Sequence, residues 1–409
     1  MRDLDWDRTS CITAVRDRVW SYLSPASQFE GPGLLVAGAL LQWPQAEAAR
    51  LGELQFLLCH EVGDFLDDLP QLMRKLTTTS DREEELSTQR IRGPVDWGHT
   101  LSMRSAAGSS DLYVTAPPRR AYQTPENELL IHVLDAIARG AQHSGWAKET
   151  HRREPARLIR KRLAEATHAQ RNRQISSIDR VAPTPRGITR IRSGRNAQRY
   201  ASVINAYDKL VALVEQMDRN AVREAVEGAG LVTAEGSILF ELLTAFQVID
   251  ALKAADWSME SFTLFAGHVY TTGSKPDGRQ LRFWYQATPN DLAASSQYMD
   301  VLTDHAFTRS RPLRPDIVLQ WTNPGSDQRW LLIECKLITS QVRAVSTAAR
   351  QALADLLLYR RDFDAVLGHG HGPYGLGVAW GEGLQPNLTS DIMLCTLDTL
   401  SHAISQTVI

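Results

Sequence analysis

Cysteine is scarce in this chain of 409 residues, and so are long apolar segments. The four cysteines lie far apart and form no C-x-x-C pair, so neither a disulfide framework nor a zinc knuckle is expected. The most apolar run, residues 33–41, is far shorter than the ~18 to 20 residues that cross a bilayer. The first residues lack the apolar core of a signal peptide. We therefore expect a soluble protein of the reducing cytoplasm, with no membrane partner.

An excess of either charge is also missing. The chain has 45 Lys and Arg against 47 Asp and Glu, with a formal net charge of −2 at pH 7. This balance excludes a protein that binds polyanions over its whole surface, so any basic surface must be local. With 43% hydrophobic residues the chain can bury a sizeable core, and its length indicates two or three domains.

Two apolar, β-prone segments near the C-terminal end predict a β-hairpin. Residues 314–319 read Arg-Pro-Asp-Ile-Val-Leu and residues 331–336 read Leu-Leu-Ile-Glu-Cys-Lys, with turn-forming residues between them. Asp316 begins the first strand, while Glu334 and Lys336 share one face of the second because side chains alternate along a strand. Two carboxylates and an ammonium group then meet at one end of the hairpin. This grouping favours a metal site, because a cation offsets the repulsion between the acids.

These residues resemble the motif of the PD-(D/E)xK nuclease superfamily, the fold of many restriction endonucleases and of the RecB and McrC nuclease domains. The motif reads Pro315-Asp316, 17 intervening residues, then Glu334-Cys335-Lys336. The resemblance implies that Asp316 and Glu334 bind one or two Mg²⁺ ions, for which Mn²⁺ could substitute, with the backbone carbonyl of Cys335 as a further ligand. Lys336 would orient or deprotonate the attacking water or, as its acidic neighbours favour, stabilise charge on the phosphate. The alternative is a surface ion cluster on an ordinary hairpin.

A helix predicted over residues 237–254 carries one acid, Glu241, within its apolar part. A glutamate in such a face is rarely left without a partner. In the superfamily, the helix before the catalytic strands often carries a further acid toward the metals, and Glu241 matches that position in order and context. It is therefore a fourth candidate catalytic residue. A place at the solvent margin of the helix explains Glu241 equally well.

A second helix, predicted over residues 340–361, carries Gln351, Asp355 and Tyr359 four residues apart on one stripe. RecB-like nucleases have a Gln-xxx-Tyr pair on the helix after the lysine strand. Here the matching spacing joins Asp355 and Tyr359, and Gln351 stands one turn earlier. Gln351 and Tyr359 are candidates for supporting the site, although the pattern departs from that of the family.

A basic segment runs from residue 148 to residue 199, where 15 Lys and Arg face four acids. Few aromatic residues interleave with these charges, which favours contact with the DNA backbone over base readout. The alternative is a solvated basic helix and linker. Three candidate DNA-binding residues share a face of a predicted helix and three follow in a predicted loop: Arg157, Arg160 and Lys161, then Arg190, Arg192 and Arg195.

The pattern of elements predicts an α+β or α/β multidomain protein. We expect a helical region over residues 1–88, a middle region over 89–228 and a nuclease domain over 229–409 with a mixed central β-sheet flanked by helices. A strand at 91–97 and a helix opening at Thr124-Pro125 resemble, loosely, the segment before the nuclease domain in McrC-like proteins. The glycine-rich segment with His369 and His371 favours a loop over a metal site.

The chain contains no G-x-x-x-x-G-K-[ST] phosphate loop, so it carries no motor of that kind. McrC-like nucleases work with a separate NTPase of the AAA+ type, and the resemblance therefore implies such a partner as well as DNA. The expected function is that of a metal-dependent DNA endonuclease subunit in a restriction or anti-phage defence system. Two alternatives stay open: a non-catalytic scaffold on a nuclease-like fold that binds DNA or activates a motor, and an RNA-cleaving nuclease. A homo-oligomer is compatible with all three.

Overall fold

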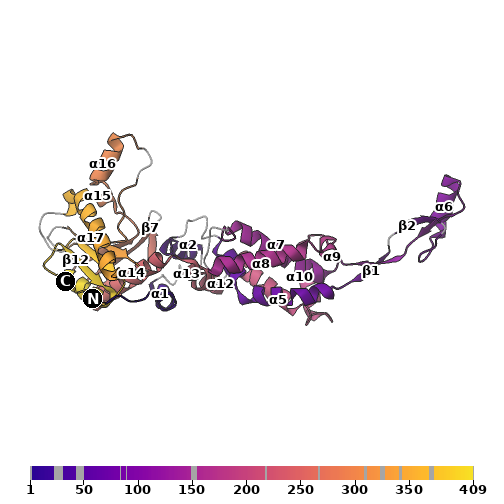
Figure 1. The fold of residues 1–409 in the computed structure, drawn as a ribbon, viewed down its shortest axis with the longest axis horizontal. Helices are drawn as coiled ribbons and strands as arrows, with labels where there is room; N and C mark the ends of the chain where they lie inside the picture. Colours follow the sequence, from indigo (N-terminus) through magenta and orange to yellow (C-terminus); the bar gives the residue numbers. More distant parts are fainter. Residues whose placement is uncertain are drawn as a thin grey trace. The chain divides into compact units, whose positions relative to one another are not determined.

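The computed structural model divides the chain into two compact units, drawn in Figure 1: the first unit is residues 1–51 with 218–409, and the second is residues 52–217. The structure describes residues 2–22, 31–42, 50–82, 84–88, 90–148, 154–216, 219–265, 268–307, 311–322, 328–339, 343–367 and 373–408. The turn expected at 323–327 and the histidines His369 and His371 lie outside these residues. No helix of the described segments is long and apolar enough to span a membrane.

A mixed sheet of eight strands forms the centre of the first unit, as the order of predicted elements indicates. The strand order is β12-β11-β10-β9-β8-β7-β5, with β6 beside β7. The strands are β5 (Ser258–Met259), β6 (Thr263–Phe265), β7 (His268–Ser274), β8 (Gln280–Tyr285), β9 (Ile317–Thr322), β10 (Gln328–Lys336), β11 (Gly375–Ala379) and β12 (Ile392–Thr396). Strands β9 and β10 pair antiparallel, which confirms the predicted hairpin strands, whereas β10, β11 and β12 run parallel.

Two long helices cover opposite faces of this sheet. Leu332 of β10 packs in one apolar cluster with Leu356 of α17 (Ala344–Asp362). Cys335, three residues further along β10, points to the other face, where it contacts Thr244 of α14 (Gly236–Ala254). Strands buried on both faces read as nearly continuous apolar runs, which explains why the two hairpin segments stand out in the sequence.

The N-terminal residues complete the first unit. Helix α1 (Arg8–Tyr22) packs along α14, with Tyr22 stacked on Phe246 at a ring-centroid distance of 5.0 Å. Ahead of α1, the carboxylate of Asp3 accepts hydrogen bonds from the backbone N–H groups of Arg343 (2.9 Å) and Val345 (3.0 Å). Asp3 thereby satisfies donors at the start of α17 that have no partner within the helix. The first 51 residues thus group with the sheet and not with the helices that follow them.

An arm of the chain, residues 287–315, connects β8 to β9. It contains α15 (Asn290–Ala293) and α16 (Gln297–Asp304). No residue of α16 is buried. The base of the arm is closed by the Thr288 hydroxyl, which donates to the Leu313 carbonyl at 2.8 Å. The buried carboxylate of Asp362, at the end of α17, accepts a hydrogen bond from the Tyr298 backbone N–H at 2.6 Å. The arm is therefore held at its base and at the start of α16, while no residue of α16 is buried.

The second unit is mainly helical. Helix α5 buries apolar side chains at three- and four-residue spacing, as the sequence pattern predicts. Helix α7 begins as predicted, with Pro125 at its first position and the Thr124 hydroxyl accepting the Asn127 N–H at 3.3 Å. Apart from α6, described below, the helices in its described segments are α4 (Leu51–Leu58), α5 (His60–Arg74), α7 (Pro125–His143), α8 (Glu154–Gln170), α9 (Arg173–Ser176), α10 (Pro185–Ser193), α11 (Ala201–Leu210) and η1 (Val211–Gln216).

Between α5 and α7 the second unit carries a narrow excursion. Strand β1 (Thr79–Arg82) pairs with β4 (Pro118–Ala121), and β2 (Glu85–Thr88) pairs with β3 (Leu112–Thr115), with helix α6 (Trp97–Ala107) between β2 and β3. A helical region was expected through residue 88, but α5 ends at Arg74 and the strands β1 and β2 follow it.

The strand predicted at residues 91–97 is wrong. Gly93 adopts a φ of 87°, and only Val95 forms a bridge, to Thr115. The Asp96 carboxylate accepts the His99 N–H at 3.0 Å and so caps α6, a helix that the prediction missed.

The remaining helices belong to the first unit. They are α2 (Gly31–Leu40), α12 (Arg219–Ala225), η2 (Val226–Gly230), α13 (Leu231–Thr233), α18 (Asp364–Leu367) and α19 (Leu397–Thr407).

Candidate active site

Strand register brings three polar residues into one row at the end of the sheet. Asp316 and Glu334 were predicted from the sequence, and Gln286 was not. Ile317 of β9 pairs with Tyr285 of β8 on one side and with Ile333 of β10 on the other. Gln286, Asp316 and Glu334, each one residue beyond these pairs, therefore lie beside one another at the same end of the three strands. The Gln286 N–H still donates to the Asp316 carbonyl at 2.8 Å. The side-chain carboxylate of Asp316 accepts a hydrogen bond from the Cys335 backbone N–H at 2.8 Å.

Lys336 lies beside Glu334, two residues further along β10, on the face predicted for it. Its Nζ is 2.6 Å from Glu334 Oε1 and 2.7 Å from Asp355 Oδ2 of α17. Burial by itself would lower the pKa of Lys336, but the carboxylates of Glu334 and Asp355 outweigh burial and raise the pKa above its ordinary value. The ammonium group therefore keeps its charge throughout the physiological pH range.

Glu241 approaches the row from α14. Its carboxylate oxygen Oε2 accepts hydrogen bonds from the side-chain amides of Gln42 (2.6 Å) and Gln286 (2.7 Å). The residue is 9% exposed, so the structure places it with Asp316 and Glu334 and not at a solvent margin of the helix. We refer to Glu241, Asp316 and Glu334 as the acid cluster.

Burial dominates the electrostatics of the acid cluster. It raises the pKa of Glu334 to about 7, with the negative charge of Asp316 as the next cause. The pKa values of Glu241 and Asp316 are raised in the same way, mainly by burial, although hydrogen bonds from Gln286 partly oppose this. Three buried carboxyl groups with one nearby ammonium group are costly to maintain, and such perturbed groups are concentrated at functional sites.

The chemistry of the acid cluster fits a divalent cation that prefers oxygen ligands, such as Mg²⁺ or Mn²⁺. In the described part of the chain, however, the ligand atoms of the cluster do not all lie within 4.8 Å of one another; those of Glu84, Asp96 and His99 do, but these three are exposed in the excursion. Hydrogen bonds from Gln286 and Lys336 hold the cluster instead. A cation would have to replace some of these bonds.

Of the two residues predicted to support the site, only Tyr359 reaches it. Its hydroxyl lies 3.1 Å from Glu334 Oε2 and 3.2 Å from the Arg314 carbonyl, so it can donate to either. Gln351 is exposed and forms no hydrogen bond with the acid cluster. Asp355, whose spacing to Tyr359 the sequence singled out, reaches Lys336 instead.

Two further site residues, Gln286 and Gln42, were not predicted. Gln286 is the last residue of a predicted strand. The register of β8 against β9, had it been known, would have placed Gln286 next to Asp316. Gln42 lies shortly after α2, 199 residues from its partner Glu241, and no local pattern indicates it.

The basic segment in the second unit is more fully paired than its composition suggests. Arg157 forms an ion pair with Glu154 at 3.0 Å, and Lys161 lies 3.8 Å from Glu165. Arg160 donates to the Lys148 carbonyl at 3.1 Å, and Arg192 forms an ion pair with Asp208.

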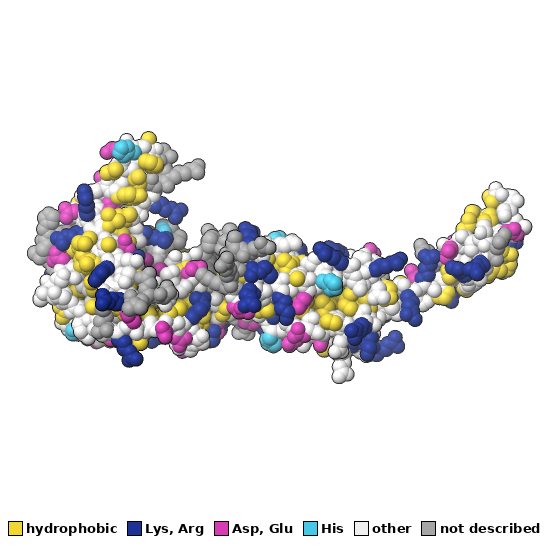
Figure 2. All heavy atoms as spheres, viewed as in Figure 1, with side chains coloured by type: hydrophobic (Ala, Val, Ile, Leu, Met, Phe, Trp, Pro, Cys, Tyr) yellow, Lys and Arg dark blue, Asp and Glu magenta, His cyan; other side chains and the backbone are white. Residues whose placement is uncertain are grey.

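The loop predicted for Arg190 and Arg192 is wrong, because Thr184 caps a helix, α10, with Pro185 at its first position. Arg195 lies beyond the end of α10, in a turn. Arg190 and Arg195 are exposed, and neither forms an ion pair or hydrogen bond through its side chain with any described residue. Figure 2 shows Lys and Arg side chains gathered around α9 and α10 on the face in view. These two arginines are therefore the best placed of the six candidates to meet a phosphate.

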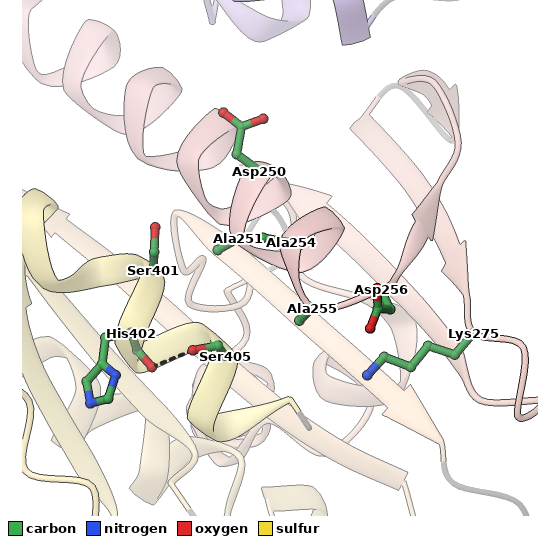
Figure 3. Close-up of a pocket in the computed structure, with 9 residues that line it drawn as sticks. All are labelled: Asp250, Ala251, Ala254, Ala255, Asp256, Lys275, Ser401, His402 and Ser405. Carbon is green, nitrogen blue, oxygen red and sulfur yellow. Dashed lines mark hydrogen bonds between the residues drawn. The ribbon is translucent and has the colours of Figure 1, made fainter.

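One cavity among the described residues, of about 760 Å³, is lined by none of the acid cluster (Figure 3). Its lining combines Asp250 and Asp256 with Lys275 and His402. Asp250 already accepts a hydrogen bond from Tyr22 and pairs with Arg18. The residues predicted as site residues from the sequence all lie outside this lining.

Comparisons with known proteins give little further information. No protein-family model and no curated protein matches the chain. Among solved structures, it is similar to a chain in the half-complex from the tetradecameric assembly of Thermococcus gammatolerans McrB AAA+ hexamers with bound McrC. The sequence identity is 10% and the TM-score is 0.26, over 98% of this chain and 76% of that chain. A TM-score this low does not establish a common fold.

Proposed function

We propose that the chain is a metal-dependent endonuclease subunit that hydrolyses DNA phosphodiester bonds in a restriction or anti-phage defence system. One observation carries the proposal: three carboxyl groups and Lys336 converge at the end of a mixed sheet. The carboxyl groups are buried, and burial of acids is costly unless a positive charge offsets theirs. A catalytic role would account for an arrangement that is costly to maintain.

In this proposal, Asp316 and Glu334 hold one or two Mg²⁺ ions, with Glu241 and the backbone carbonyl of Cys335 as further ligands. The bound ion would lower the pKa of a water molecule and offset charge on the phosphate. Tyr359 fixes the carboxylate of Glu334 by a hydrogen bond, and so restricts the directions from which Glu334 can coordinate.

Lys336 is the electrostatic residue of the proposed reaction. Its ammonium group keeps its charge because Glu334 and Asp355 flank it, so it cannot serve readily as a general base. A fixed positive charge next to the scissile phosphate instead stabilises the charge that develops in the transition state. Asp355 orients Lys336 from α17.

DNA would be held by its backbone, for which the exposed Arg190 and Arg195 of the second unit are the best candidates. Arg157, Arg160, Lys161 and Arg192 would have to exchange their present partners for phosphates. The chain lacks a phosphate loop, so a separate AAA+ NTPase, as in McrC-like systems, is the proposed source of movement along DNA. The second unit is the proposed docking element for that motor.

A cleavage assay tests the proposal. The full-length chain, with Mg²⁺ or Mn²⁺ and with or without a candidate motor, should cut DNA, whereas Asp316→Ala and Lys336→Ala should reduce the rate by at least about a hundredfold. Asp391→Ala is the matched control, because this exposed acid pairs with Arg360 and lies outside the acid cluster. Undiminished cutting by either site variant would contradict the assignment.

The same assay separates the two alternatives. A non-catalytic scaffold would bind DNA or stimulate a motor equally well with Lys336→Ala, and no preparation would cut. An RNA-cleaving nuclease shares the catalytic groups, so parallel DNA and RNA substrates of one sequence distinguish it.

A further inference from the structure

The side chain of Gln286 forms hydrogen bonds with two acids of the cluster, Glu241 and Asp316. Its side-chain Nε2 donates to Glu241 Oε2 at 2.7 Å and to Asp316 Oδ1 at 2.9 Å. Both partners are carboxylates, which accept hydrogen bonds, so the NH₂ end of the amide and not its carbonyl must face them. The two N–H bonds of one amide group are therefore both used, one for each acid.

The backbone of Gln286 is strained in order to place this amide. The residue has a φ of 51°, in the left-handed region that non-glycine residues rarely adopt. Such a conformation persists only when its surroundings impose it, and strained residues are concentrated at functional sites. Here the backbone N–H is held by the Asp316 carbonyl at 2.8 Å, and the side chain is 8% exposed.

Gln42 provides a comparison within the same site. Its Nε2 donates to the same oxygen of Glu241 at 2.6 Å, but no hydrogen bond joins it to Asp316. Gln42 therefore satisfies one acid, whereas Gln286 lies between two. A cation held by both Glu241 and Asp316 would therefore have to compete with the hydrogen-bond donors of Gln286.

We propose that Gln286 is a positioning residue that takes the place of a divalent cation between Glu241 and Asp316, and that binding of the cation by both acids displaces its amide. This inference rests on the proposed function, in which the acid cluster binds Mg²⁺. Removing the amide would leave two carboxylates facing each other and would also remove the group that competes with the cation. Metal-free stability and metal affinity should therefore change in opposite directions.

The test uses three variants of the full-length chain. Gln286→Met keeps the length of the side chain without its donors, and Gln286→Asn has an amide too short to reach both acids. Gln42→Met removes a donor from Glu241 alone. For each, thermal unfolding is measured without metal, and the Kd for Mg²⁺ and for Mn²⁺ is measured by calorimetry.

Gln286→Met and Gln286→Asn should each lower the metal-free Tm by several degrees and bind Mg²⁺ on the order of tenfold more tightly than the wild-type chain. Gln42→Met should change the Kd by a smaller factor. Unchanged Kd values, or weaker binding by both Gln286 variants, would overturn the proposal, since the amide would then not compete with the cation.

The outcome also separates this inference from the proposed function. A wild-type chain that cuts DNA with Mg²⁺ while Gln286→Met leaves Kd unchanged overturns only the role of Gln286. A wild-type chain that binds neither Mg²⁺ nor Mn²⁺ overturns both.

Discussion

The acid cluster of the first unit and the basic helices α8 and α10 of the second unit both concentrate charge of one sign, but they treat it differently. The cluster buries its three carboxyl groups and joins them through residues distant in sequence, such as Gln42 and Gln286. The basic helices keep most of their charges exposed and pair several with nearby acids, such as Glu154 and Glu165.

The difference shows why a count of charges is a poor guide to a binding surface. Much of the positive charge between residues 148 and 199 already has a local partner, and exposed ion pairs of this kind contribute little to stability. One arginine, Arg162, is not at the surface at all: it is 7% exposed and donates to the Cys59 carbonyl at 2.9 Å. Burial and pairing, which composition does not report, decide which charges remain available.

The largest expected effect breaks the apparent uniformity of the basic segment. Arg162→Met should lower the free energy of unfolding by about 3 kcal/mol, because it leaves the buried carbonyls of Leu57 and Cys59 without their donor. Arg190→Met should change it by less than about 0.5 kcal/mol, since that side chain is exposed. Chemical denaturation of the two variants measures both values, and similar losses would refute the distinction.

A second prediction concerns the pH dependence of the acid cluster. The pKa of Glu241 is raised to about 7 in the folded chain, mainly by burial, from an ordinary value of 4.5. The folded state therefore binds more protons than the unfolded state between these values, and stability falls as pH rises through this range.

Glu241→Gln removes that penalty and keeps an oxygen for the amides of Gln42 and Gln286. Without metal, we expect it to stabilise the chain on the order of 2 kcal/mol at pH 8 and hardly at all at pH 4. Thermal unfolding at the two pH values checks this, with Asp391→Asn as an exposed control. Equal effects at both pH values would show that burial of the charge is not the cause.

The smallest effect sharpens the contrast within the basic helices. Replacing Arg190 and Arg195 together by Gln should weaken DNA binding several-fold and reduce the slope of log K against log salt by roughly 2. Replacing Arg157 and Lys161 should reduce it less, because Glu154 and Glu165 compete for these side chains. Fluorescence anisotropy at several salt concentrations gives both slopes. An equal reduction by the two pairs would mean that local ion pairing does not matter here.

The hairpin and the main elements of the sheet could be predicted because strands buried on both faces have an apolar pattern. The alternation of side chains along a strand also predicted that Glu334 and Lys336 share one face. Gln286 could not be predicted in the same way, since its proximity to Asp316 follows from the register between two strands that are separated by the arm.

The error at α10 has a different cause. Thr184-Pro185 is the same start signal as Thr124-Pro125, which predicted α7 correctly, but the glycine and proline residues of the segment also favour a loop.

The arm between β8 and β9 separates distance along the chain from distance in space. Its closed base, from Thr288 to Leu313, fixes where Gln286 and Asp316 emerge, so residues added or removed near α16 leave the two side chains in register. Changes in the length of the chain there should leave the acid cluster intact. For the experimenter, the exposed end of α16 is accordingly an attachment point for a fluorophore or an affinity tag close to the acid cluster in sequence and tolerant of insertion in structure.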